Sequence, residues 1–175
     1  MKMSLAVAAS VGCLALGVCI GLVAKSKEPG IDLIRGKPPK EAAAAALSEA
    51  EKLAGHGTWE LLGVARVYYL SGDKAKGQAL IDQVVNGKND SGDWTRIGWI
   101  YADAGENTKA AYWFDKATAA DPKDDTGEAE VGGWYLRIGE RDKGEALLAK
   151  ALAKHPDEMW HYVRAAEGFY GVPAR

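Results

Sequence analysis

The most constraining feature of this sequence is an internal repeat with a period of 33 to 34 residues. The segments that align are GDKAKGQALIDQV (72–84), GENTKAAYWFDKA (105–117) and GERDKGEALLAKA (139–151). Each begins with a glycine, with a small residue five places later and a large apolar residue four places beyond that. Repeats of this length are units that bury their apolar faces only by stacking on their neighbours. The sequence therefore predicts a stack of similar units.

The middle unit shows how each repeat is expected to fold. Trp94, Ile97, Gly98 and Tyr101 are spaced three, one and three residues apart, which places them on one face of a helix. A glycine turn and a second helix follow. Small residues let the two backbones approach, and large side chains fill the adjoining space. The predicted packing residues are Trp94, Ile97, Gly98, Tyr101, Ala110, Phe114, Ala117 and Pro122.

This pattern resembles the tetratricopeptide repeat family. Residues 91–124 match the W…L-G…Y…A…F…A…P signature at every position, with Ile97 in place of leucine. Residues 125–158 match with Glu128 at the tryptophan position, and residues 58–90 match more weakly. The stretch KAAYWFDKA is also similar to a Sel1-like repeat. The resemblance implies an all-α fold, a right-handed α-solenoid of about three helix pairs.

Both ends of the repeat region fit a stack with capping helices. A helix predicted over 40–55 carries Ala43 and Leu47 where the second helix of a preceding unit would. A closing helix over 159–170 continues the period as far as Phe169. The expected order is an N-terminal segment (1–24), a linker (25–39) and a solenoid (40–171) made of the cap helix, repeats 58–90, 91–124 and 125–158, and the closing helix.

The N-terminal segment contains 19 consecutive uncharged residues, 5–23, after Lys2. A run of this length is long enough to cross a membrane as a helix and also fits a secretory signal peptide. The short, early-lysine start favours export to the extracytoplasmic side. The lysines and arginine that follow the run instead favour an anchor with the domain in the cytoplasm. Both cysteines lie within the run, so the repeats contain no thiol.

Composition and motifs favour binding over catalysis. The formal net charge is −2 with no basic stripe, so a nucleic-acid partner is not expected. The three histidines, His56, His155 and His161, form no catalytic or metal-ligand motif with their neighbours. The acidic cluster from Asp121 to Glu128 lacks the spacing of a calcium loop and is interpreted as solvated turn charges. We expect no enzyme, cofactor or metal site.

The resemblance implies a concave groove, lined by the first helix of each pair, that takes a peptide or a partner helix. Chaperone-binding members grip a carboxylate there, but only Arg96 occupies a matching position in this chain. Trp59, Tyr69 and Trp99 are expected to be exposed. An alternative is stacking of a glycan or cell-envelope polymer on these rings. The predicted groove residues are Trp59, Leu62, Arg66, Tyr69, Thr95, Trp99, Ala102, Asp103, Ala129, Gly133, Leu136 and Arg137, with Val163 and Glu167 from the closing helix.

Overall fold

A computed structural model of the protein describes residues 30–173, and this part of the chain is all-α, without a strand. The α-helix nearest the N-terminus begins at Pro39, because the fixed φ and the missing N–H of proline suit the start of a helix. The elements are η1 (Ile31–Leu33), α1 (Pro39–Ala54), α2 (Thr58–Ser71), α3 (Lys74–Asn86), α4 (Ser91–Asp103), α5 (Asn107–Ala120), α6 (Asp125–Arg137), α7 (Arg141–Lys154) and α8 (Met159–Tyr170).

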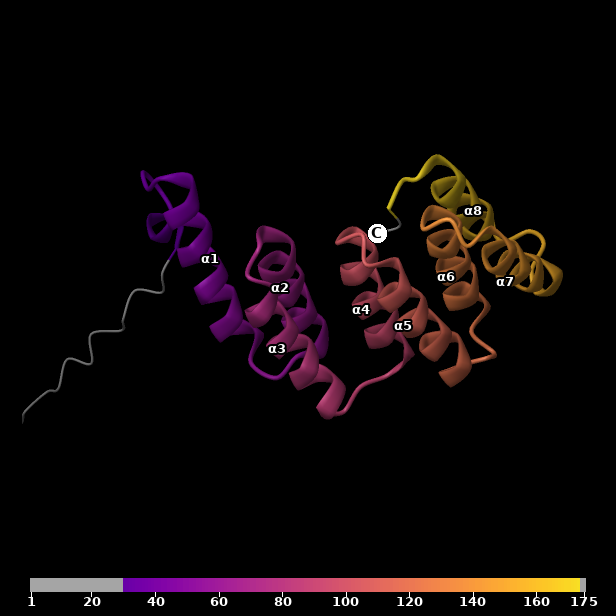
Figure 1. Cartoon of the computed structure of the whole chain (residues 1–175), viewed down its shortest axis with the longest axis horizontal. Coiled ribbons are helices and arrows are strands. Elements are labelled where there is room, and N and C mark those ends of the chain that lie inside the picture. The colour runs from indigo at the N-terminus through magenta and orange to yellow at the C-terminus, as the bar shows by residue number, and fades with distance from the viewer. Residues whose placement is uncertain (1–29, 174–175) are drawn as a thin grey trace, which may run out of the picture.

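Consecutive helices pack as pairs that follow one another along the long axis of the molecule (Figure 1). Contacts within the pairs α2/α3, α4/α5 and α6/α7 are far more extensive than contacts between neighbouring pairs. At one end α1 packs against α2, and at the other end α8 packs closely on α6. The residues predicted as a linker include the short helix η1, which contacts α1.

Each pair turns at a glycine in the left-handed conformation. Gly105, with φ of 73°, and Gly139, with φ of 90°, follow the first helices of their pairs. After α4, the amide of Glu106 donates to the Tyr101 carbonyl at 2.8 Å, and the Gly105 amide donates to Ala102 at 3.1 Å. These two bonds satisfy carbonyls that the helix end would otherwise leave without partners. Gly105 and Gly139 therefore determine where α4 and α6 end.

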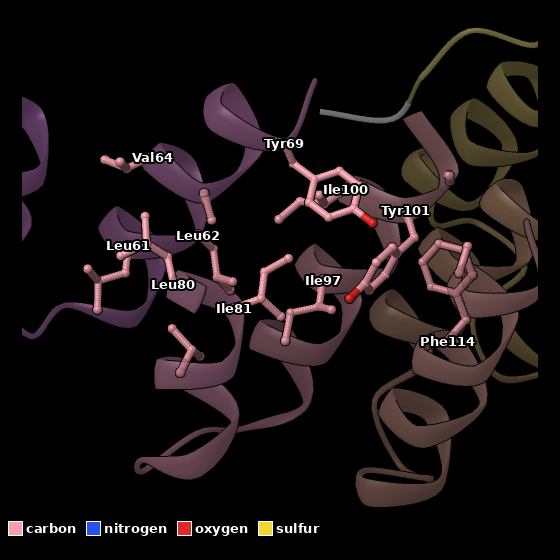
Figure 2. Packing of buried hydrophobic residues seen from close by; sticks show 14 of the residues in the cluster. Leu61, Leu62, Val64, Tyr69, Leu80, Ile81, Ile97, Ile100, Tyr101 and Phe114 are labelled. Atoms are coloured by element: carbon pink, nitrogen blue, oxygen red, sulfur yellow. The ribbon is translucent and has the colours of Figure 1, made fainter. Parts of the chain in front are cut away.

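Close packing within a pair depends on the small residues that the repeat places between the helices. A Cβ added to Gly98 in α4 would overlap the ring of Phe114 in α5. Phe114 is fully buried, with ring centres of Trp134 and Tyr135 at 6.0 and 5.6 Å. Figure 2 shows Phe114 beside Tyr101 in the apolar cluster that runs across the pairs. Of the predicted packing residues, Ile97, Gly98, Tyr101, Ala110, Phe114 and Ala117 are buried, Trp94 is half-buried and Pro122 is exposed just after α5.

One polar contact recurs in all three pairs. A lysine near the start of each second helix lies over the ring of a tyrosine in the first helix, an arrangement in which the cation is attracted to the negative face of the ring. The nitrogen-to-centroid distances are 4.3 Å for Lys76 and Tyr68, 5.1 Å for Lys109 and Tyr101, and 5.0 Å for Lys143 and Tyr135.

Glu128 stands at the position that Trp94 takes in the preceding repeat, and α7 supplies the charges that it requires. Its side chain is almost fully buried and accepts hydrogen bonds from Lys150 and from Lys154, the latter at 3.3 Å. Two ammonium groups therefore balance one buried carboxylate, as a charge in this position requires.

Among residues 30–173, none of the helices has both the length and the apolar character needed to cross a membrane. The predicted membrane or signal segment, residues 5–23 within 1–24, lies outside the described residues.

Candidate functional site

A pocket of about 210 Å³ opens among the N-terminal halves of the first helices α4 and α6 and beside the start of α2. Three predicted groove residues line it: Trp59 from α2, and Thr95 and Trp99 from α4. Arg96 and Glu130 line it as well, one from α4 and one from α6. The structure therefore brings together part of the predicted groove around two charged side chains.

Arg96 is held against aromatic rings in this pocket. Its guanidinium carbon lies 3.1 Å from the ring centre of Trp59 and 5.2 Å from that of Trp99. Burial lowers the pKa of Arg96, although the negative charges of Glu130 and Asp93 act in the opposite direction. In the described part of the chain no carboxylate or carbonyl accepts a hydrogen bond from its guanidinium. The donors of Arg96 are thus positioned by stacking and left available.

Glu130 occupies the equivalent position in the next repeat. Burial raises the pKa of its carboxyl group, while Arg164 and Arg96 lower it by a smaller amount. Arg164 itself pairs with Glu167 at 2.7 Å. Within residues 30–173 the Glu130 carboxylate has no ion pair or hydrogen bond. The pocket therefore offers one set of donors and one acceptor that are near each other without being paired.

A second group of predicted groove residues forms an ion cluster across three helix pairs. The carboxylate of Asp103 in α4 accepts from Arg66 in α2 at 2.7 Å and from Arg137 in α6 at 3.0 Å. Only a tenth of the Asp103 side chain is exposed. The three residues thus lie together on the first helices. Their charges pair with one another, so the cluster links the three helix pairs.

The expected exposure of Tyr69 is wrong, and the predicted groove residue Leu62 does not reach the surface either. Leu62 is buried, and Tyr69 is only 3% exposed, with its ring packed edge-on against Tyr101 at 5.5 Å. Figure 2 shows both side chains inside the apolar cluster. Tyr69 also donates its hydroxyl to Glu106 at 3.0 Å. Tyr69 therefore faces the next helix pair, a contact that the pattern within one helix pair does not reveal.

Trp99, Leu136 and Thr95 are only partly available. Trp99 is half-buried and stacks on Trp134 with 6.0 Å between ring centres. Leu136 is half-buried against α7, where a side chain on Gly144 would strike it. Thr95 is buried, and its hydroxyl donates to the Ser91 carbonyl at 3.1 Å. Among the predicted aromatics, Trp59 alone is largely exposed.

The remaining predicted groove residues differ in exposure. Ala102, Ala129 and Gly133 are buried, and Val163 and Glu167 in α8 are half-buried. Arg96 was considered only as a position that matches a carboxylate grip, and Glu130 was not among the predicted groove residues. Each lies three residues before a predicted groove residue, Trp99 and Gly133. Residues three apart share a helix face, so this spacing could have identified both.

The histidines near α6 form a separate polar contact. His155 Nδ1 lies 2.6 Å from Asp125 Oδ2, and the fully buried His161 Nε2 lies 3.5 Å from the same oxygen. The hydrogen bond from His155 lowers the pKa of Asp125. No group of three or more histidine, cysteine, aspartate or glutamate side chains between residues 30 and 173 is arranged to hold a metal ion.

Comparisons with known proteins find no matching family model, no matching curated protein and no matching solved structure.

Proposed function

We propose that this chain is a non-enzymatic interaction module, a right-handed α-solenoid of the tetratricopeptide type that binds an extended peptide or a partner helix. The observation that carries the proposal is the pocket around Arg96 and Glu130, in which a guanidinium and a carboxylate lack hydrogen-bond partners within the described chain. Both side chains are half-buried. A ligand that covers the pocket would bury them fully, so a ligand that also supplies their hydrogen-bond partners avoids the cost of unpaired buried groups.

A peptide amide fits the chemistry of these two groups. Its carbonyl accepts from the Arg96 guanidinium, and its N–H donates to the Glu130 carboxylate. A ligand with only a carboxylate would be attracted by Arg96 but repelled by Glu130. A ligand with only an ammonium group would be attracted by Glu130 but repelled by Arg96. The neutral, dipolar amide avoids both conflicts. Trp59, with 55% of its surface exposed, supplies apolar contact beside it.

The alternative, stacking of a glycan or envelope polymer on groove aromatics, has less support. Tyr69 is buried, and Trp99 is stacked on Trp134. The guanidinium of Arg96 already covers one face of the Trp59 ring. A stacking platform needs an open ring face, so these rings offer less to a sugar than to a peptide side chain.

The proposed setting is a membrane-tethered or exported module, with the solenoid on the extracytoplasmic side favoured over an anchor that faces the cytoplasm. This part rests on residues 5–23, whose 19 uncharged residues are long enough to span a bilayer.

Selection from a random peptide-display library on the full chain tests the binding function. Selected peptides are synthesised, and their affinity is measured by fluorescence anisotropy for the wild type and for Trp59→Ala, Arg96→Gln and Glu130→Gln. We expect each substitution to weaken binding at least about tenfold, because each removes a central contact. Tyr112→Ala is the control, since Tyr112 is exposed on α5 and lies outside the pocket.

Failure to enrich any peptide, or enriched peptides that bind all three pocket variants like the wild type, would contradict the proposal. A glycan array read in parallel addresses the alternative: saccharide binding that Trp59→Ala abolishes would favour it.

A further inference from the structure

Carboxylate side chains make up much of the lining of the pocket around Arg96. The sequence alone favoured solvated turn charges for the acidic cluster from Asp121 to Glu128, but the structure places part of this cluster at the pocket. The carboxylates that line it are those of Asp121, Asp124, Glu128 and Glu130. They come from the junction of α5 and α6 and from the first half of α6, whereas Arg96 comes from α4. The pocket therefore has carboxylates on one wall and a stacked guanidinium on another.

Three of these four carboxylates have no cationic partner within residues 30–173. Glu128 is balanced by two lysines of α7. In the described chain, the side chains of Asp121 and Asp124 accept only main-chain N–H groups of their own turns, at 3.3 and 2.9 Å. Both aspartates are exposed, and Glu130 is half-buried. These three groups can therefore accept hydrogen bonds from a charged donor of a ligand.

Arg96 does not neutralise this wall of the pocket. It is the one cationic side chain among the described residues that line the pocket. Burial lowers the pKa of Arg96, and the negative charges of Glu130 and Asp93 act against this effect. The guanidinium is thus already matched by more than one carboxylate. Asp121 and Asp124 add to this negative charge, so the pocket retains an excess of it at its exposed edge.

We propose that the peptide bound in this pocket is basic, with a lysine or arginine side chain that pairs with Asp121 and Asp124. A main-chain amide of the same peptide meets Arg96 and Glu130. This inference rests on the proposed function and adds the charge of the partner to it. A charged donor forms a stronger hydrogen bond with a carboxylate than a neutral donor does. An acidic peptide would bring like charges together, so the same wall discriminates against it.

Peptides selected from a random display library on the full chain test this charge preference. They are synthesised with an acetylated N-terminus and an amidated C-terminus, so that only side chains carry charge. In each peptide the lysines and arginines are replaced in turn by glutamine, and affinities are measured by fluorescence anisotropy at low and high salt. We expect the enriched peptides to contain lysine or arginine, and we expect their affinity to fall as salt screens the attraction.

The double variant Asp121→Asn/Asp124→Asn removes the two proposed partners. Asparagine keeps an oxygen that accepts main-chain N–H groups, so the turn and the N-cap of α6 remain. We expect this variant to bind the basic peptides about fivefold more weakly, because each exposed ion pair contributes little and two carboxylates are removed. Replacing the pairing lysine or arginine by glutamine should abolish the difference between the variant and the wild type.

The matched control is Asp73→Asn/Asp142→Asn, which changes the net charge by the same amount. Asp73 is the N-cap of α3, Asp142 is exposed on α7, and neither lines the pocket. This variant should bind the basic peptides like the wild type.

Enriched peptides without lysine or arginine, or equal affinity of basic peptides for the wild type and Asp121→Asn/Asp124→Asn, would overturn the proposal. Equal weakening by the control variant would also overturn it, because the effect would then follow from the net charge of the chain. In each of these cases, loss of binding in Arg96→Gln would leave the peptide-binding function standing. If no peptide is enriched, both the function and the charge preference are wrong.

Discussion

Glu106 shows how one side chain joins two helix pairs. Its carboxylate accepts hydrogen bonds from Lys74 and Lys109, each at 2.7 Å, and from the Tyr69 hydroxyl at 3.0 Å. Tyr69 and Lys74 belong to the α2/α3 pair, and Glu106 and Lys109 lie at the start of α5. The bonds from Lys109 and Lys74 lower the pKa of Glu106 to about 2.

This lowered pKa predicts a specific dependence of stability on acid. A carboxylate whose folded pKa lies below its unfolded value stabilises the fold above the unfolded pKa and loses that contribution as the pH falls to the folded one. For Glu106 the interval runs from 4.5 to about 2. Glu106→Gln should be less stable at neutral pH and lose less stability than the wild type across this interval.

Urea unfolding followed by circular dichroism at several pH values measures this difference. Glu145→Gln is the matched control, because Glu145 pairs with Arg141 at an exposed site where the ion pair adds little. Parallel acid profiles for the wild type and Glu106→Gln would contradict the role assigned to Glu106.

At the scale of the helical element, two glycines on first helices have opposite surroundings. A Cβ added to Gly133 in α6 would strike the carbonyl oxygen of Arg164 in α8, so the absence of a side chain is what allows α8 to pack. A Cβ added to Gly63 in α2 would meet no atom within 4 Å. Position 133 therefore requires glycine, whereas glycine at position 63 only adds the entropic cost of ordering its backbone in the helix.

Gly133→Ala should therefore displace α8 while leaving the other helices in place. We expect faster amide hydrogen exchange over Met159–Tyr170 and a lower free energy of unfolding. Gly63→Ala should leave exchange in α8 unchanged and stabilise the fold by about 0.5–1 kcal/mol, because alanine loses less backbone entropy than glycine in a helix. Equal exchange in α8 for both variants would show that the Gly133 contact does not hold this helix.

The helical elements could be predicted from the sequence because their faces repeat. The helix predicted over 40–55 spans Pro39–Ala54, and the helix predicted over 159–170 spans Met159–Tyr170. It was harder to predict which side of each first helix faces the groove and which side packs against a neighbouring pair. Tyr69 was expected in the groove, but it packs against the next pair, and that geometry depends on how the pairs are placed relative to one another.

At the scale of the whole molecule, the helix pairs follow one another in a row, with α1 before the first pair and α8 packed on α6 of the last pair (Figure 1). The repeat and the family resemblance predicted an all-α fold, and residues 30–173 are all-α. The sequence did not predict the pocket around Arg96 and Glu130, because that pocket arises where two repeats meet. A period describes what the units share, whereas these two side chains differ between units.

The full chain should be directed to a membrane or across it by residues 5–23, because 19 uncharged residues favour hydrocarbon over water. Cell fractionation measures this, and full-length protein found only in the soluble cytoplasmic fraction would contradict it. Alkaline phosphatase fused after Arg175 reports orientation. Activity is expected if the helical region is exported, and silence with good expression would instead indicate an anchor that leaves the helical region in the cytoplasm.

The ion cluster at Asp103 bears on the elasticity of the molecule. A row of pairs that pack tightly within themselves and sparsely between themselves bends at the boundaries, and Asp103 crosses two of these boundaries at once. Its arginine partners remain a third and a fifth exposed, so dissolved salt reaches and weakens these attractions. The molecule should therefore bend more easily as ionic strength rises, and Asp103 is a residue that resists bending at both boundaries between the helix pairs.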